Sequence, residues 1–144
     1  MKLYCVNTLT GLVPCGDDDY DQKKRLSLGQ VYLVEIKLSR NYPFLKKYFA
    51  LIRCAWEYLS EAQQEFFGYN VTTFRKAVEV AAGWFDLNYN INRDEWYQAP
   101  KSIAFDSMNE EEFSNLYDSV KDVLFQTYLT NISKQDFLSN LINF

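Results

Sequence analysis

The sequence predicts a single α+β domain over residues 1–144, with two β-hairpin-like strand groups packed with three to four amphipathic helices. Two patterns carry this prediction. In several short segments bounded by turn residues, apolar and polar positions alternate, which is typical of strands. In longer segments, apolar residues recur at intervals of three and four, which is typical of helices. A chain of 144 residues has the usual size of one domain, so we expect one core.

The first forty residues are predicted to hold three strands and a short helix. Residues 2–7 and 11–14 form two strands joined by a turn at 8–11. The run GDDDYDQKKR places three aspartates before three basic residues, as a short helix does when its charges follow the backbone dipole. Residues 30–38 show the clearest strand pattern in the chain. One side of that strand carries Tyr32, Val34, Ile36 and Leu38.

Residues 42–59 are predicted to form the principal helix. Asn41 is a suitable N-cap, and Pro43 fits the first turn, where its missing N–H costs nothing. We expect the apolar face of this helix to lie in the core. That face consists of Leu45, Tyr48, Phe49, Ile52, Ala55, Trp56 and Leu59.

Two further helices and a hairpin follow. Residues 61–67 are predicted to form a short helix that ends at Gly68. Thr72 or Thr73 is the predicted cap of the next helix, which Gly83 ends. Its apolar face carries Phe74, Ala77, Val78 and Ala81. Residues 84–91 and 95–99 then form the predicted second hairpin, with its turn at 92–94.

The last part of the chain carries two capping-box patterns, at residues 107–110 and 133–136, each of which predicts a helix start. The first helix presents Phe113, Leu116, Tyr117, Val120, Leu124 and Tyr128 at helical spacing. Before it, residues 100–108 are predicted to be a short buried strand in which Ile103 and Phe105 point inward and Lys101 faces solvent.

The composition excludes several kinds of chemistry. The chain contains no histidine, so Ser-His-Asp and Cys-His catalysis, histidine metal ligation and histidine pH switching are absent. Neither of the usual glycine-rich nucleotide-binding motifs occurs. Catalysis by Lys, Tyr, Cys or carboxylate side chains stays open, although no motif clusters them. We predict a protein that is not an enzyme and that has no cofactor.

We predict no metal site either. The dense early carboxylate cluster consists of Asp17, Asp18, Asp19 and Asp21. A calcium loop would need a glycine where Gln22 stands and a bidentate Glu where Leu28 stands. A solvated cluster at a helix start is the better interpretation.

The three cysteines, Cys5, Cys15 and Cys54, have neither a zinc-site spacing nor the even number of a disulfide framework. We expect free thiols in a reducing compartment. Cys5 and Cys15 lie symmetrically about the first turn, which leaves open that they face each other across the hairpin. No membrane-length apolar run and no signal-peptide pattern occurs, so we expect a soluble intracellular protein without a membrane partner.

Charge is distributed unevenly along the chain. The formal net charge is −4. Residues 23–53 carry eight basic side chains against the single Glu35, a local charge of +7. Residues 106–122 carry six acidic side chains against Lys121, a local charge of −5. A patch whose sign opposes the net charge can steer a phosphate-rich partner into one orientation.

We therefore predict that one flank of the helix 42–59 binds the partner. Lys46 and Arg53 lie seven residues apart on that flank, about 100° from the apolar stripe. The predicted partner-binding residues are Arg40, Tyr42, Lys46, Lys47 and Arg53, with Tyr42 available for stacking on a base. Two alternatives stay open. The flank is a solvated face on which Arg53 pairs with Glu57, or the acidic helix 108–130 is the interface.

Two segments together carry a family resemblance: residues 40–51, and residues 100–108 followed by 111–113. They resemble an uncharacterised family of small phage- and prophage-encoded proteins, members of which occur near phage replication and recombination genes. The N-terminal strand and residues 11–14 fit as well, so the resemblance spans nearly the whole chain. It implies a phage or mobile-element origin, and with it the cytoplasm of a bacterial host. It implies no reaction.

The interpretation we favour is a non-catalytic phage or mobile-element protein that binds a nucleic-acid-handling machine, most sharply a counter-defence (anti-CRISPR) inhibitor of a CRISPR-type effector. Its partner would be a host or phage protein or a ribonucleoprotein complex. The alternative is a DNA replication or recombination accessory that binds single-stranded nucleic acid or a recombinase. A steep salt dependence of nucleic-acid affinity would favour the alternative.

Overall fold

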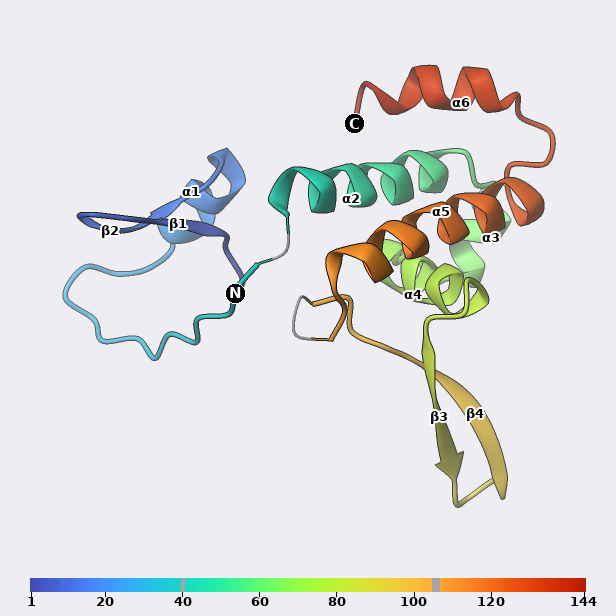
Figure 1. The fold of residues 1–144 in the computed structure, drawn as a ribbon, viewed down its shortest axis with the longest axis horizontal. Coiled ribbons are helices and arrows are strands. Elements are labelled where there is room, and N and C mark those ends of the chain that lie inside the picture. The colour runs from blue at the N-terminus through green and yellow to red at the C-terminus, as the bar shows by residue number, and fades with distance from the viewer. Residues whose placement is uncertain (40, 105–106) are drawn as a thin grey trace. The chain divides into compact units, whose positions relative to one another are not determined.

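The computed structural model describes residues 1–39, 41–104 and 107–144 (Figure 1). Its contacts fall into two compact units, Met1–Ser39 and Arg40–Phe144, and each unit is described by itself. The predicted α+β class is confirmed, because the described residues form two antiparallel two-stranded sheets and six helices. The prediction of a single domain over residues 1–144 stays a prediction.

The first unit is built on a short hairpin and a helix. Strands β1 (Cys5–Thr8) and β2 (Gly11–Pro14) pair in antiparallel register around a two-residue turn, and Gly11 there has a φ of 132°. The predicted short helix is confirmed as α1 (Asp17–Lys23). Asp19 is buried, not solvated as expected for the whole carboxylate cluster, and its side chain accepts a hydrogen bond of 2.9 Å from the backbone N–H of Tyr4. This bond ties the helix to the hairpin.

The hairpin register corrects the suggested facing of Cys5 and Cys15. Cys5 stands opposite Pro14, and the backbone N–H of Cys15 bonds to the carbonyl oxygen of Tyr4 at 2.9 Å. The two-residue turn shifts the pairing by one position, so the two cysteines are not cross-strand partners, although they are close enough for Cys15 to contribute to the raised pKa of Cys5, after the larger effect of burial. All three cysteines are free thiols.

The strand predicted over residues 30–38 is wrong, because these residues take no regular secondary structure. Alternation shows which side chains would share a face. It does not supply a neighbouring strand, and a strand is stable only when its backbone groups are paired. The apolar side chains of the segment are therefore in solvent, with Ile36 exposed to 72%.

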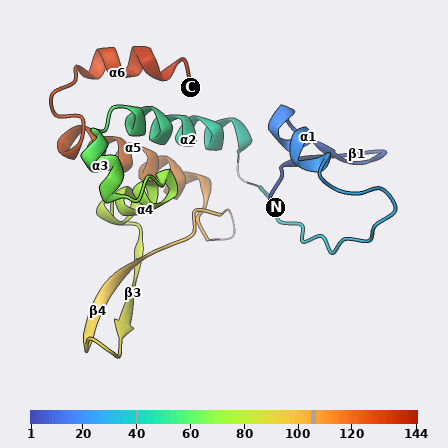
Figure 2. The same cartoon turned by 180° about the vertical axis from the view of Figure 1, so that it is seen from behind.

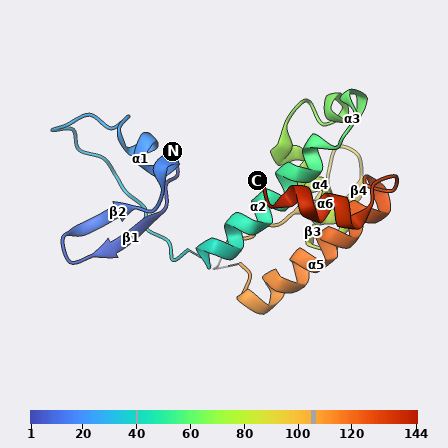
Figure 3. The same ribbon diagram turned by 90° about the horizontal axis from the view of Figure 1, so that it is seen from above.

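The second unit is a helical assembly with one β-ribbon. Its helices are α2 (Tyr42–Glu57), α3 (Glu61–Phe66), α4 (Val71–Ala81), α5 (Glu110–Thr127) and α6 (Lys134–Leu141). Helix α2 packs against α4, α5 and α6, and α6 crosses it in the view from above (Figure 3). The core of this unit includes Leu45, Tyr48, Leu51, Ile52, Phe74, Val78, Phe113, Val120, Leu124 and Phe137. Among the described residues, no helix is long and apolar enough to cross a membrane.

The principal helix is confirmed in its position and its cap. The Asn41 side chain accepts a hydrogen bond of 3.2 Å from the backbone N–H of Phe44. Five of the seven residues predicted on this face are buried, whereas Phe49 and Trp56 are only half-buried. Three helices pack around α2, so Ala50, Leu51 and Cys54, outside the predicted stripe, are buried as well.

Two predicted caps are corrected. Helix α4 is capped by Asn70, whose side chain accepts hydrogen bonds from the backbone N–H groups of Thr72 and Thr73, the residues predicted as caps. Helix α5 is capped by Asn109 instead of Ser107. Asparagine accepts such bonds as well as serine or threonine does, so a sequence with several candidates leaves the cap undecided. The cap of α6 at Ser133 is confirmed.

The second hairpin is confirmed as β3 (Phe85–Asn90) and β4 (Glu95–Pro100). It extends away from the helices as a ribbon, which is visible from both sides (Figures 1 and 2). The indole N–H of Trp84 donates to the carbonyl oxygen of Ser102 at 3.1 Å and fastens the base of the ribbon. Gly83, with a φ of 95°, ends α4 just before it.

The prediction of a short strand over residues 100–108 is wrong, because the described residues after Pro100 form no strand. Ile103 is half-buried, and Phe105 lies outside the described residues. Lys101, expected to face solvent, lies with its ammonium 4.4 Å from the ring centre of Trp84 and 3.7 Å from the carboxylate of Asp86. The aromatic ring and the carboxylate attract the ammonium to the ribbon.

Candidate partner-binding surface

The predicted site lies on the outer side of α2. The structure places Lys46, Lys47 and Arg53 in solvent and leaves Tyr42 half-buried at the start of the helix. Arg40 lies outside the described residues. We call Lys46, Lys47 and Arg53, together with Tyr42, the basic flank. The helical spacing of the three cations therefore predicted their exposure correctly.

Aromatic rings hold the two lysines of the basic flank. The ammonium of Lys46 lies 4.9 Å from the ring centre of Tyr42, and that of Lys47 lies 5.3 Å from the ring centre of Tyr117 on α5. The ammonium of Lys121 is 5.8 Å from the same Tyr117 ring. Such contacts limit the freedom of a lysine side chain without neutralising its charge.

Lys121 and Tyr117 were missed by the sequence analysis. Tyr117 was taken only as a core residue, and Lys121 only as the lone base of an acidic segment. The packing of α5 against α2 brings the ammonium groups of Lys121 and Lys47 to the same Tyr117 ring. The signal available in the sequence was the i,i+4 spacing of Tyr117 and Lys121, which places them on one face of a helix.

Among the described residues, the cations of the basic flank have no carboxylate partner. Within the described part of the chain, none of Lys46, Lys47 and Arg53 takes part in an ion pair, including the suggested pair of Arg53 with Glu57. The ammonium of Lys121, by contrast, lies 3.9 Å from the carboxylate of Asp118. The three charges of the flank are thus left to solvent and to whatever binds there.

A buried polar network lies on the other side of α2. The carboxylate of Glu79 on α4 is 0% exposed. Its Oε1 accepts a hydrogen bond of 2.7 Å from the hydroxyl of Tyr48 and another of 2.7 Å from the guanidinium of Arg75. Its Oε2 is buried and has no hydrogen-bond partner in the part of the chain that the structure describes. This network fastens α2 to α4 and so holds the basic flank in place.

Burial of Tyr48, together with the neighbouring Glu79 carboxylate, raises the pKa of its phenol far above the usual 10.0. A group whose pKa is higher in the folded protein than in the unfolded chain adds stability at pH values below the unfolded pKa. This added stability is lost as the pH rises above that value. Above pH 10, we therefore expect the free energy of unfolding of the parent to fall as the pH rises. This fall should be steeper than in Tyr48→Phe by about 1.4 kcal/mol per pH unit. Urea titrations between pH 8 and 11 measure both slopes, and equal slopes would contradict the assignment.

The acidic end of α5 lies at the start of α2. The Glu110 carboxylate accepts a hydrogen bond of 3.3 Å from the backbone N–H of Asn41. Glu110, Glu111 and Glu112 form the first turn of α5, where carboxylates favour the helix dipole. Asp106 lies outside the described residues. The acidic residues thus have a structural role at two helix starts, and this observation favours the basic flank over the acidic helix as the interface.

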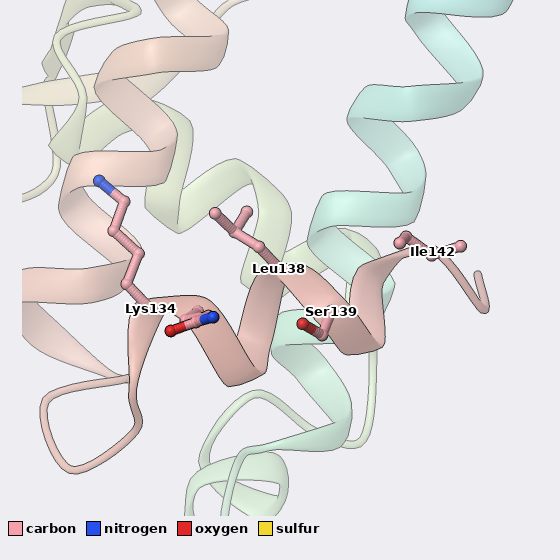
Figure 4. A pocket seen from close by; sticks show the side chains of 5 residues that line it. Lys134, Leu138, Ser139 and Ile142 are labelled. Carbon is pink, nitrogen blue, oxygen red and sulfur yellow. The ribbon is translucent and has the colours of Figure 1, made fainter.

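Two other surfaces expose apolar groups. The β3–β4 register places Leu87, Tyr89 and Trp96 on one face of the ribbon, and Trp96 is 68% exposed. Helix α6 bears a surface hollow lined by its own residues, among them Lys134, Leu138 and Ile142 (Figure 4). Neither surface has a cluster of charged groups of one sign. In the ranges that the structure describes, no three His, Cys, Asp or Glu side chains gather as metal ligands would.

A family model described as "Protein of unknown function (DUF1367)" matches residues 3–65 and 60–143. The two matched stretches together span nearly the whole chain, which agrees with the expectation of an uncharacterised family. Comparison with curated proteins and with solved structures gave no match.

Proposed function

The chain belongs to the DUF1367 family of proteins of unknown function, and we propose that it acts by binding, not by catalysis, with the basic flank of α2 as its contact surface. One observation carries the proposal. Three exposed cations, which have no carboxylate partner among the described residues, stand on a helix whose opposite side is buried against three others. Exposed charges add little to the stability of the fold, and like charges on one helix repel each other. Their presence together therefore points to a role in binding.

The partner that fits this surface is rich in phosphate. The protein as a whole is acidic, so a local group of cations such as the basic flank helps to orient an anionic partner as it approaches. The lysines are held by aromatic rings, which lowers the entropy lost when they contact an anion. A nucleic-acid-handling machine presents phosphates next to protein and fits both features.

The sharper form of the proposal is a counter-defence protein of phage or prophage origin that inhibits a CRISPR-type effector in the cytoplasm of a bacterial host. The resemblance described above supports this origin. A small acidic protein with one basic surface can occupy a nucleic-acid-facing site of a ribonucleoprotein and repel other nucleic acid from it.

The second candidate is an accessory protein of phage replication or recombination that binds single-stranded nucleic acid or a recombinase. Tyr42 favours it, because the ring lies at the start of α2 beside the Lys46 ammonium. An aromatic ring next to a cation is the arrangement on which unpaired bases stack.

The double variant Lys46→Glu/Arg53→Glu tests both forms. We expect it to melt within about 2 °C of the parent, since exposed charges contribute little to stability. We expect its affinity for the partner to fall at least about tenfold, because two attractive contacts become repulsive. Differential scanning calorimetry gives the melting temperature. Calorimetric titration gives the affinity, first with single-stranded DNA and then with a purified CRISPR effector complex.

The matched control is Lys2→Glu/Lys23→Glu, which changes the net charge equally at exposed sites of the first unit, Met1–Ser39. It should bind as the parent does. Equal binding by the parent and by Lys46→Glu/Arg53→Glu at two salt concentrations would show that the flank is only a solvated face.

Salt dependence separates the two candidates. Direct binding to nucleic acid releases counterions and weakens steeply between about 50 and 200 mM salt. The affinity for a protein surface of the effector should change less with salt. It should also be measurable when the protein has no affinity for naked nucleic acid.

A further inference from the structure

Residues 31–39 carry an unused strand pattern. Val34, Ile36 and Leu38 would share one strand face, and they are 66%, 72% and 77% exposed. Within the described part of the chain, the backbone of residues 33–39 makes no hydrogen bond. β-Branched and other apolar residues in alternation favour a strand only when a partner pairs with it.

The charges of this segment indicate which partner fits. Glu35 and Lys37 are the charged residues between Gln30 and Ser39, and they lie two apart. In a strand they would stand on the same face, on either side of Ile36. In the structure their charged groups are 3.6 Å apart and both side chains are exposed. A segment with one charge of each sign, symmetric about an apolar residue, is complementary to an antiparallel copy of itself.

We infer that residues 33–39 pair with the same residues of a second copy of this chain, as an antiparallel strand pair with Ile36 opposite Ile36. In that register each Glu35 faces a Lys37 and each Val34 faces a Leu38. The pair contains two cross-strand ion pairs, and its six apolar side chains lie together on one face. The inference is independent of the proposed function, because it involves no residue of the basic flank.

Other registers are less favourable. A shift by one residue in pairing places Glu35 opposite Ile36 and mixes the polar and apolar faces. A shift by two places Glu35 opposite Glu35 in one direction and Lys37 opposite Lys37 in the other. A parallel pair in register also sets like charges side by side, which destabilises a pair of strands. The charge pattern therefore selects one antiparallel register.

Tyr32 marks the beginning of the paired segment. Its hydroxyl accepts a hydrogen bond of 3.0 Å from the backbone N–H of Ser27. This contact holds the chain before residue 33 in a local turn and leaves residues 33–39 free for pairing. The association is isologous, because the same residues are used in both copies, so it closes at a dimer.

A charge swap tests the register. Sedimentation equilibrium of the full chain should show a concentration-dependent dimer. Glu35→Lys alone or Lys37→Glu alone sets two like-charged pairs opposite each other and should weaken the dimer about tenfold. The double variant Glu35→Lys/Lys37→Glu restores opposite charges and should dimerise as the parent does. A parent that stays monomeric up to millimolar concentration would overturn the inference, as would a dimer with the same affinity in all four proteins.

A cysteine placed on the two-fold axis gives an independent readout. Opposed residues of an antiparallel pair have Cα atoms about 4.5 to 5.5 Å apart, within reach of a disulfide. Ile36→Cys should therefore form a covalent dimer under mild oxidation. Leu38→Cys, which would face Val34, is the matched control and should not. The register is wrong if Leu38→Cys forms the covalent dimer as readily as Ile36→Cys does. It is also wrong if the parent, through its own cysteines, forms as much covalent dimer as Ile36→Cys.

Discussion

Replacing Arg75 by methionine is expected to lower the free energy of unfolding by about 3 to 5 kcal/mol. The guanidinium is the one cation bonded to the Glu79 carboxylate in the described structure, at 2.7 Å, and the side chain of Glu79 is 0% exposed. Methionine retains much of the apolar length of arginine but leaves a buried negative charge with only the Tyr48 hydroxyl as a donor. Urea denaturation followed by circular dichroism measures the loss.

The control for this prediction removes both charges. Arg75→Met/Glu79→Leu should recover most of the lost stability, because replacing a buried ion pair by apolar groups of similar volume is often neutral or favourable. A loss below about 1 kcal/mol in Arg75→Met, or a double variant as unstable as the single one, would show that Arg75 does not stabilise the buried Glu79 carboxylate.

Replacing Phe74 by alanine is expected to cost about 3 to 5 kcal/mol, because the ring is fully buried and its removal leaves a cavity in the core. Its centre lies 5.6 Å from that of Trp56, 5.3 Å from Phe67 and 5.4 Å from Tyr128. Trp56 lies on α2, and Phe67 and Tyr128 directly follow α3 and α5, so the cavity would open where four helices of the second unit meet. The denaturation midpoint in urea checks this.

Two neighbouring aromatics provide graded controls. Trp56 is half-buried, so Trp56→Ala should cost less than Phe74→Ala, although the sequence pattern placed Trp56 in the core. Phe66 packs edge-on against Phe67 but is 83% exposed, and Phe66→Ala should change stability by no more than about 0.5 kcal/mol. An order in which Phe66→Ala is the most costly would refute the assigned packing.

The candidate site shows how far residue spacing reaches. Helical periodicity located α2, and with it the exposure of Lys46, Lys47 and Arg53. It could not place Lys121 beside Lys47, because the two lie on different helices and meet only through the packing of α5 on α2. Spacing likewise gave no sign that Glu79 is buried. A carboxylate next to an apolar stripe is normally exposed, and only a tyrosine from another helix and Arg75 make its burial tolerable.

Local periodicity, turn residues and caps were enough to predict the α+β class, both hairpins and the location of each helix that the structure describes. They did not reveal which caps are used, where Lys101 and Glu79 lie, or that residues 30–38 have no neighbouring strand. The difference lies in the range of the interactions. A helix satisfies its own backbone hydrogen bonds within four residues, whereas a strand, a buried charge and a shared aromatic ring each depend on a partner from elsewhere in the chain, which local spacing does not specify.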